Sequence, residues 1–268
     1  MKPLFPRPAL LYTATMSKLI DFAAIKEIQR KSRQGEAGRL RKEFNRSYRA
    51  LLDSSYEEIR GNVSGYISST GESVTCAKGC AYCCEHFVSV PVSHAIVATD
   101  YLYASENAMS AFLRSYPAWL SAIEDNPAAK AVFDKLEEDT TLRAIVKQSS
   151  EKLRSAYHHF AVPCPFLVSK RCSIYPVRPI ACAAFFSLTS PEFCLAENEI
   201  PVVHFQAVPS PAKLKRMSEL TNYRLWAHQE SLPKLVYRLL TVGLPEVSRE
   251  VDKLFNTPQQ PGEDDPRP

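Results

Sequence analysis

The sequence predicts a mainly α-helical domain in which two cysteine-rich loop segments are brought together. Apolar residues recur at the three- and four-residue spacing of helices over most of the 268-residue chain. Segments with the character of strands are too few for a series of strand–helix–strand units. All eight cysteines fall in two groups, within 76–84 and 164–194, and the second group is rich in proline and loops.

Composition narrows the class of protein. Hydrophobic residues make up 45% of the chain, which indicates a folded core, and the 8 glycines form no phosphate-binding loop motif. The net charge of +4 is spread too widely to indicate nucleic acid. No apolar run approaches the roughly 20 residues that cross a membrane, and the proline-broken start does not resemble a secretory signal. We therefore expect a cytoplasmic protein, in which thiols stay reduced.

We expect one domain with two loose ends. Residues 1–16 are predicted to be a flexible N-terminus, and Met16 is an alternative start. A single helical domain is predicted over 17–256, with the cysteine-cluster core at 76–194. The polar, proline-rich tail at 257–268 is predicted to be disordered.

The first region, 17–68, is predicted to be mostly helical. Its apolar residues recur at helical spacing: Leu19, Phe22, Ile25, Ile28, Leu40, Phe44, Tyr48, Leu51 and Leu52. Gly61, Gly65 and Gly71 are expected to loosen the approach to the first cysteines. Basic residues crowd the stretch 30–49, namely Arg30, Lys31, Arg33, Arg39, Arg41, Lys42, Arg46 and Arg49. This basic helix is either a solvated face or a docking surface for an acidic protein partner.

Two helices should follow the first cysteines. The stretch "FVSVPVS" is expected to be extended and to break at Pro91, after which Ser93 can cap a helix over 93–105. A further helix over 106–125 should kink or split near Pro117.

Helix is also expected on both sides of the second cysteines. One long amphipathic helix is predicted over 128–160; its apolar face comprises Val132, Leu136, Leu142, Ile145, Val146, Leu153 and Tyr157. Residues 212–255 should return to helix, with breaks near Pro233 and Pro245.

The cysteines have the spacing of metal ligands. Cys76, Cys80 and Cys83 are separated by three and two residues, so three thiolates can point at one centre while Gly79 supplies a sharp bend. The adjacent Cys83 and Cys84 diverge, and one arrangement sends them to different centres. The later group, after about eighty residues, supplies further ligands from Cys164, Cys172, Cys182 and Cys194.

The two groups are therefore expected to form one shared metal site, with all eight cysteines as candidate ligands. Cys84 and Cys194 are expected to be weaker ligands than the other six. Eight thiolates could serve two tetrahedral zinc ions, or one [4Fe–4S] cluster with cysteines to spare. The alternative is a set of reduced, buried or redox-labile thiols without metal.

The sequence resembles a known family in this region. "CAKGCAYCC" and the later "CPFLVSKRCSIYPVRPIAC" resemble the YkgJ-like cysteine-cluster family, described as a zinc- or iron-chelating domain. The matching residues are the first four cysteines, then Cys164, Pro165, Phe166, Leu167, Cys172, Ile174, Tyr175, Arg178, Pro179 and Cys182. The resemblance covers roughly 76–194 and implies zinc or iron as the bound metal. A weaker resemblance, to flagellin lysine-N-methylases, implies an iron–sulfur-dependent methyltransferase.

Four neighbouring residues need separate interpretation. The family often has Arg after the last cysteine of its motif, where this chain has Ala183. Arg178 can offset thiolate charge or hold a loop by binding backbone carbonyls. Tyr175 is expected to pack and not to react. His86 is expected to be packed or solvated, with a ligand role as the alternative.

Three functions stay open at this stage. A metal-binding protein is favoured, followed by a methyltransferase and by a zinc-stabilised interaction module that docks through the basic helix. The first three cysteines also match radical-SAM spacing, but no glycine lies between residues 80 and 242 to form the segment that binds the cosubstrate. No catalytic residue can be assigned, and the sequence does not decide whether the protein is an enzyme.

Overall fold

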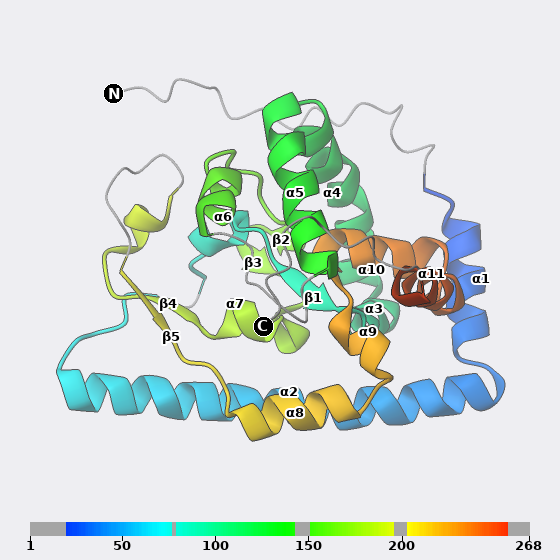
Figure 1. Cartoon of the computed structure of the whole chain (residues 1–268), viewed down its shortest axis with the longest axis horizontal. Coiled ribbons are helices and arrows are strands. Elements are labelled where there is room, and N and C mark those ends of the chain that lie inside the picture. The colour runs from blue at the N-terminus through cyan, green and yellow to red at the C-terminus, as the bar shows by residue number, and fades with distance from the viewer. Residues whose placement is uncertain (1–19, 77–78, 143–150, 196–202, 257–268) are drawn as a thin grey trace, which may run out of the picture.

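The computed structural model describes residues 20–76, 79–142, 151–195 and 203–256, and these residues are mainly helical (Figure 1). The expected N-terminus 1–16 and tail 257–268 lie outside the described residues. The principal helices are α1 (Phe22–Ser32), α2 (Gly35–Thr70), α3 (Val92–Ala104), α4 (Glu106–Glu124), α5 (Pro127–Leu142), α6 (Glu151–His158), α8 (Pro211–Glu219), α10 (Leu232–Thr241) and α11 (Leu244–Asn256). The predicted helical class is therefore confirmed.

Strands are short and pair only in twos within the described residues. β1 (Ser89–Pro91) pairs with β6 (Gln229–Ser231), β2 (Leu167–Val168) with β3 (Arg171–Cys172), and β4 (Phe185–Ser187) with β5 (His204–Gln206). All three pairs are antiparallel. Two-stranded ribbons of this length are not stable on their own, so each pair depends on packing against the rest of the protein.

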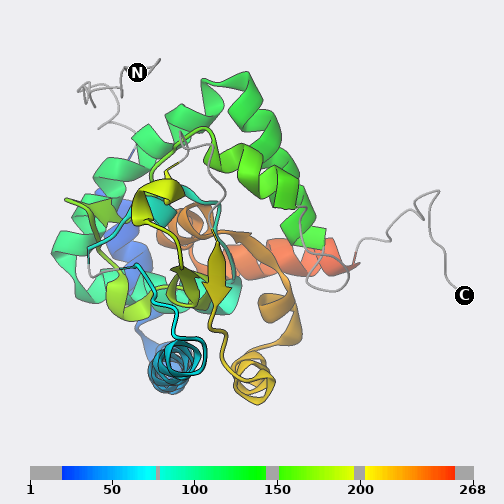
Figure 2. The same ribbon diagram turned by 90° about the vertical axis from the view of Figure 1, so that its left-hand side faces the viewer.

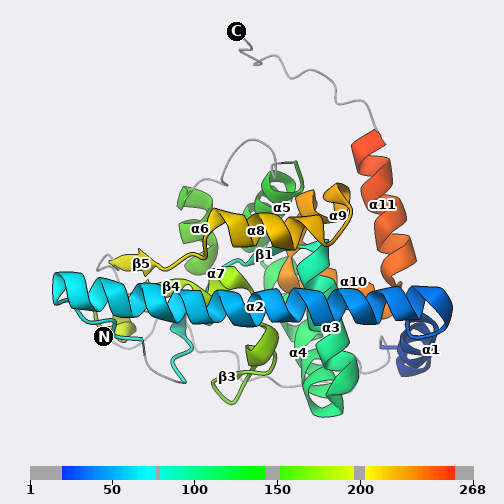
Figure 3. The same ribbon diagram turned by 90° about the horizontal axis from the view of Figure 1, so that it is seen from below.

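Helix α2 forms the base of the molecule, and α8 lies beside it (Figures 1 and 3). Seen along its axis in Figure 2, α2 lies below the other helices with α8 at its side. Lys213 of α8 donates from Nζ to the backbone oxygen of Ser54 at 2.9 Å and pairs with Glu58 at 2.8 Å. These contacts fix α8 along the middle of α2.

The prediction that the glycines loosen the end of this region is wrong for two of them. Gly61 and Gly65 lie inside α2, and only Gly71, with φ of 72°, ends the helix. Each internal glycine costs about 1 kcal/mol of helix stability relative to alanine. Packing holds this last part of α2 in place, since the ring of Tyr66 stacks on Phe205 of β5 at 4.2 Å.

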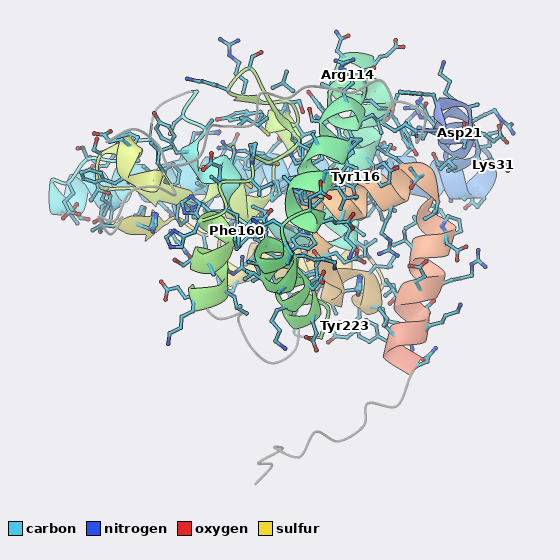
Figure 4. All side chains as sticks on the ribbon, turned by 90° about the horizontal axis from the view of Figure 1, so that it is seen from above. Asp21, Lys31, Arg114, Tyr116, Phe160 and Tyr223 are labelled. Atoms are coloured by element: carbon cyan, nitrogen blue, oxygen red, sulfur yellow. The ribbon has the colours of Figure 1, made fainter. Side chains whose placement is uncertain are left out.

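The core is centred on α3 and α10, which pack together. Leu102 of α3 and Leu235 of α10 are fully buried. Tyr116 of α4 lies where that helix meets α10 (Figure 4), and its ring stacks on Tyr237 at 4.0 Å. This contact joins α4, which precedes the second cysteine segment, to α10, which follows it.

The predicted cap of α3 is wrong. The helix begins at Val92 with Pro91 as N-cap, and no capping side-chain hydrogen bond is formed there. Ser93 instead lies fully buried in the first turn. The reason is tertiary: β1 leads directly into the helix, and the N–H of Val92 donates to the carbonyl of His228 at 3.3 Å.

The other helix predictions are partly confirmed. Pro117 lies inside α4, which runs through it as one helix. The predicted long helix 128–160 is described as α5 and α6, and its residues Ile145 and Val146 lie outside the described residues. The region 212–255 breaks near both expected prolines, at the starts of α10 and α11, and also contains α9 (Tyr223–Ala227) and the unpredicted β6.

No helix in the described part of the chain has the length and apolar character needed to span a bilayer.

Candidate metal centre

The first cysteine segment, 76–84, follows the end of α2. Gly79, which was predicted to supply a sharp bend, adopts φ of 94°, a conformation that favours glycine. A 3₁₀ turn, η2 (Tyr82–Glu85), then carries Cys83 and Cys84. Residues 77–78 lie outside the described residues. A 3₁₀ turn has about three residues per revolution, so the bend that carries these two adjacent cysteines is tight.

The second cysteine segment, 164–194, consists of short strands, 3₁₀ turns and a one-turn helix. Cys172 lies on β3, and Cys182 lies on the one-turn helix α7 (Ile180–Ala183). Cys194 ends the 3₁₀ turn η4 (Pro191–Cys194). Cys164 precedes β2, and its carbonyl accepts from the N–H of Leu167 at 2.9 Å.

Backbone hydrogen bonds join the two segments. The N–H of Cys164 donates to the carbonyl of Cys84 at 2.8 Å. The N–H of Thr75 donates to the carbonyl of Ser187 at 2.9 Å, and the N–H of Ser187 contacts Sγ of Cys76 at 3.2 Å. The turns η2 and η4 also pack together. Two groups about eighty residues apart in sequence are therefore neighbours in space.

All eight cysteines are within the described residues, and all are free thiols. Cys194 is buried and the other seven are partly buried. Among the described residues, no three Cys, His, Asp or Glu side chains are arranged so that they could hold a metal ion. The expected single site is therefore not formed as such, although its segments are adjacent.

Burial holds most of these thiols in their protonated form. It is the largest cause of the raised pKa of Cys76, Cys172, Cys182 and Cys194, and it raises the pKa of Cys164 to about 12. A thiol in such surroundings ionises when a cation takes the place of its proton.

Cys83 and Cys84 form a hydrogen-bonded pair with opposite shifts. The bond from Cys84 is the largest cause that lowers the pKa of Cys83, to about 7, and Arg178 adds to it. The same bond raises the pKa of Cys84 above its usual range. Cys83 is therefore the thiol of the pair that ionises first, while Cys84 keeps its proton and donates the hydrogen bond.

Arg178 lies within the second cysteine segment, between Cys172 and Cys182. Its positive charge helps to lower the pKa of Cys83 and opposes the rise caused by burial at Cys172. Its guanidinium also lies over the ring of Tyr175, 4.1 Å from the centroid. Tyr175 is 55% exposed, so the expectation that it packs holds only for this face of its ring.

Hydrogen bonds from the half-buried Tyr56 and the buried His94 hold the loop that carries Arg178 against the helices. The hydroxyl of Tyr56, from α2, donates to the carbonyl of Arg178 at 2.5 Å. Nε2 of His94, from α3, lies 3.0 Å from the carbonyl of Val177. Burial lowers the pKa of His94 to about 4, so the neutral ring donates this bond. The helical frame thereby fixes where the guanidinium meets the thiols.

His86 is packed, as expected. Its ring stacks on His158 of α6 at 3.9 Å and meets Phe185 edge-on at 5.8 Å. Burial is the largest cause that lowers the pKa of His86 to about 3, and His158 adds to the effect. Sequence reasoning missed His158 and His204, because they come from α6 and β5 and show no motif that links them to the cysteines.

Comparison with known proteins gives no further assignment: no family model, no curated protein and no solved structure matches this chain.

Proposed function

We propose that this protein binds zinc or iron through the thiolates of its eight cysteines. Iron would be bound as single ions or as a [4Fe–4S] cluster. The observation that carries the proposal is the direct backbone bond between Cys164 and Cys84, which brings two groups of free thiols together. Clustered thiolates are the ligands that zinc and iron–sulfur clusters select. The resemblance of residues 76–194 to the YkgJ-like family supports the same proposal.

The charge balance also supports metal binding. Burial keeps most of these thiols protonated at neutral pH, and a bound divalent ion would replace their protons and offset the repulsion between the resulting thiolates. Arg178 adds a fixed positive charge next to Cys83 and Cys172. Because a guanidinium keeps its charge throughout this range, it would stabilise the loaded site without competing as a ligand.

The test is a metal analysis of protein purified without oxygen. Mass spectrometry of the metals should find zinc or iron at one or more equivalents per chain. Broad visible absorption that bleaches on reduction would identify an iron–sulfur cluster, whereas zinc leaves the protein colourless. Protein that carries no metal, and that takes up neither zinc nor ferrous iron when reduced, would contradict the proposal.

A second candidate function, docking of an acidic protein, is favoured by one observation. Lys42, Arg46 and Arg49 lie on the exposed side of α2, and none of them forms an ion pair with another described residue. Their spacing of four and three residues aligns them along one face. Reversing these three charges should abolish binding of an acidic partner and leave metal content unchanged.

Methyl transfer, implied by the weaker family resemblance, stays a prediction. It is tested directly by incubating the reduced, metal-loaded protein with labelled S-adenosylmethionine and a lysine-rich protein substrate. Transfer of label to the substrate would establish it.

A further inference from the structure

A cavity of about 280 Å³ lies between α4, α5 and α10, and none of its lining residues belongs to a cysteine segment. Helix α4 packs on both of the other helices (Figure 1). The apolar lining of the cavity comprises Tyr116, Leu120, Ile123 and Phe133, and the remaining lining residues are charged. Sites for small molecules typically have volumes of roughly 300–1,000 Å³. The cavity therefore has room for a small ligand, and neither the metal proposal nor the basic helix uses it.

Ring contacts fix the apolar wall of the cavity. The ring of Tyr116, from α4, stacks on Tyr237 of α10 at 4.0 Å. Phe133 of α5 is buried, and its ring meets Trp119 edge-on at 5.7 Å. Because these rings are already held in place, a ligand that enters loses little free energy to the ordering of side chains.

The hydroxyl of Tyr116 has no hydrogen-bond partner among the groups that the structure describes, although the residue is only 5% exposed. A buried hydroxyl without a partner costs free energy. Burial is the largest cause that raises the pKa of Tyr116, and the neighbouring Tyr237, Glu137, Glu124 and Glu230 raise it further. The hydroxyl oxygen therefore lies among negative charges, which favour a positively charged donor.

The carboxylates in and beside the cavity outnumber the cations. Each cation of the lining already pairs with a carboxylate: Lys130 with Asp134 at 2.5 Å, Lys234 with Glu137 at 3.1 Å, and Arg238 with both Glu230 and Glu250. Three cations thus stand against five carboxylates once Glu124 is included, and the excess persists even if His228, which hydrogen-bonds Glu230, carries a proton.

Glu124 is the lining carboxylate that is left over. It forms no ion pair with another residue in the described part of the chain, since the nearby Lys130 pairs with Asp134. An anion entering the cavity would have to displace a carboxylate from Lys234 or Arg238, whereas a cation would meet a free one.

We propose that this cavity binds a small organic cation, an amine whose ammonium group donates to the hydroxyl of Tyr116 and to the carboxylate of Glu124. The apolar part of the amine lies against Phe133 and Ile123. Charge-assisted hydrogen bonds are stronger than neutral ones, so the ammonium group supplies the selectivity and the rings supply the contact area.

Three probes of one shape test the charge that the cavity selects. Phenethylamine is a cation at pH 7, 2-phenylethanol is neutral and phenylacetate is an anion. The chain has two tryptophans, so Trp226→Phe leaves Trp119, beside Tyr116 and Phe133, as the reporter of fluorescence. Phenethylamine should give a saturable change in this fluorescence. The alcohol should bind about tenfold more weakly, and phenylacetate should not bind. Phenylacetate binding as tightly as the amine would overturn the proposal, and so would phenethylamine giving neither a fluorescence change nor heat in calorimetry.

Two conservative variants place the binding in the cavity. Tyr116→Phe keeps the stacked ring and removes the hydroxyl, so phenethylamine should bind about tenfold more weakly. Glu124→Gln should weaken it about threefold, because this carboxylate is exposed to water. The matched controls are Tyr223→Phe, at a tyrosine that is 60% exposed on α9, and Glu106→Gln, at the other end of α4; both should bind as the wild type does. Unchanged affinity in both cavity variants would overturn the proposal. All four variants should keep the metal content of the wild type, so this proposal and the metal proposal can fail independently.

Discussion

The backbone N–H of Cys164 donates to the carbonyl oxygen of Cys84 at 2.8 Å, and this bond joins residues about eighty apart in the chain. It acts on the main chain, so the approach of the two cysteine segments does not depend on any metal–sulfur bond. Metal would therefore reinforce an arrangement that the helices already impose. Such a site loses rigidity without metal but keeps its surrounding fold.

Removal of metal should loosen residues 76–194 more than the terminal helices. A metal that binds only the native protein, at a free concentration 100 times its dissociation constant, adds about 2.7 kcal/mol of stability, or roughly 100-fold slower opening. The amide of Cys164 should show this change in hydrogen exchange. The amides of α1 and α11 serve as the internal reference. Equal protection with and without metal would contradict the prediction.

Cys83 should be the thiol that is alkylated fastest at neutral pH in the metal-free protein. Its pKa lies near 7 because Cys84 donates a hydrogen bond to it and Arg178 lies nearby, whereas burial raises the pKa of Cys164 to about 12. In Cys84→Ala, the midpoint of the pH–rate profile should rise toward the ordinary 9.0. Arg178→Leu should raise it less, and Arg178→Lys less still.

This profile can be measured with iodoacetamide and peptide mass spectrometry at a series of pH values. A midpoint that does not move in Cys84→Ala would show that the neighbouring thiol does not set the pKa of Cys83.

The sequence predicted the helices best where apolar spacing was regular. Tyr48 and Leu52, which belong to the predicted face of α2, are almost completely buried. The unpredicted features all depend on distant contacts. Three-residue strands such as β1 and β6, whose partners lie about 140 residues apart, carry too little local signal to be read from sequence. Ser93 was predicted to be a cap because the sequence does not show that β1 pairs with β6 directly before the helix.

The candidate site was predicted only in part for the same reason, since part of it depends on contacts between distant segments. Cysteine spacing predicted that the two cysteine segments lie together, which the bond between Cys164 and Cys84 confirms. It could not predict which thiols contact one another, because that depends on how the loops fold and not on neighbours in sequence. The stacking of His86 on His158 could likewise not be predicted from the sequence, since it depends on where α6 packs in the fold.

Phe166→Ala should destabilise both the fold and the β2–β3 ribbon that carries Cys172. The Phe166 ring is almost fully buried and stacks on Phe112 of α4 at 4.4 Å. Its carbonyl accepts from the N–H of Ser173, next to Cys172. Loss of a buried phenyl ring typically lowers the free energy of unfolding by about 3–5 kcal/mol.

Urea unfolding measures this cost, and zinc titration measures the effect on metal. Phe22→Ala is the matched control, because Phe22 is 46% exposed and should cost far less. If Phe166→Ala unfolded at the same urea concentration as the control, the ring would not anchor the β2–β3 ribbon.

Glu230 should make the free energy of unfolding of the metal-free protein depend on pH in the acidic range. Its carboxylate is buried and accepts hydrogen bonds from Nε2 of His228, at 2.7 Å, and from Arg238. Burial alone would raise the pKa of Glu230, but these bonds outweigh it and lower the pKa to about 2 from 4.5. A lowered pKa means that the stabilisation is complete above pH 4.5 and is lost as the pH falls through 2. The shift corresponds to about 3 kcal/mol.

Glu230→Gln should therefore cost about 3–5 kcal/mol at pH 7, since it breaks a buried ion pair. The difference from wild type should shrink as the pH falls from 4.5 toward 2, because the wild-type carboxylate is then protonated and the two side chains become alike. Glu27→Gln is the control: Glu27 also pairs with an arginine, Arg30, and its pKa is also lowered to about 2, but water surrounds the pair and screens it. Urea unfolding at several pH values should leave that control close to wild type throughout. A penalty for Glu230→Gln that stayed constant from pH 7 to pH 2 would mean that its charge contributes nothing, and that the loss came from packing alone.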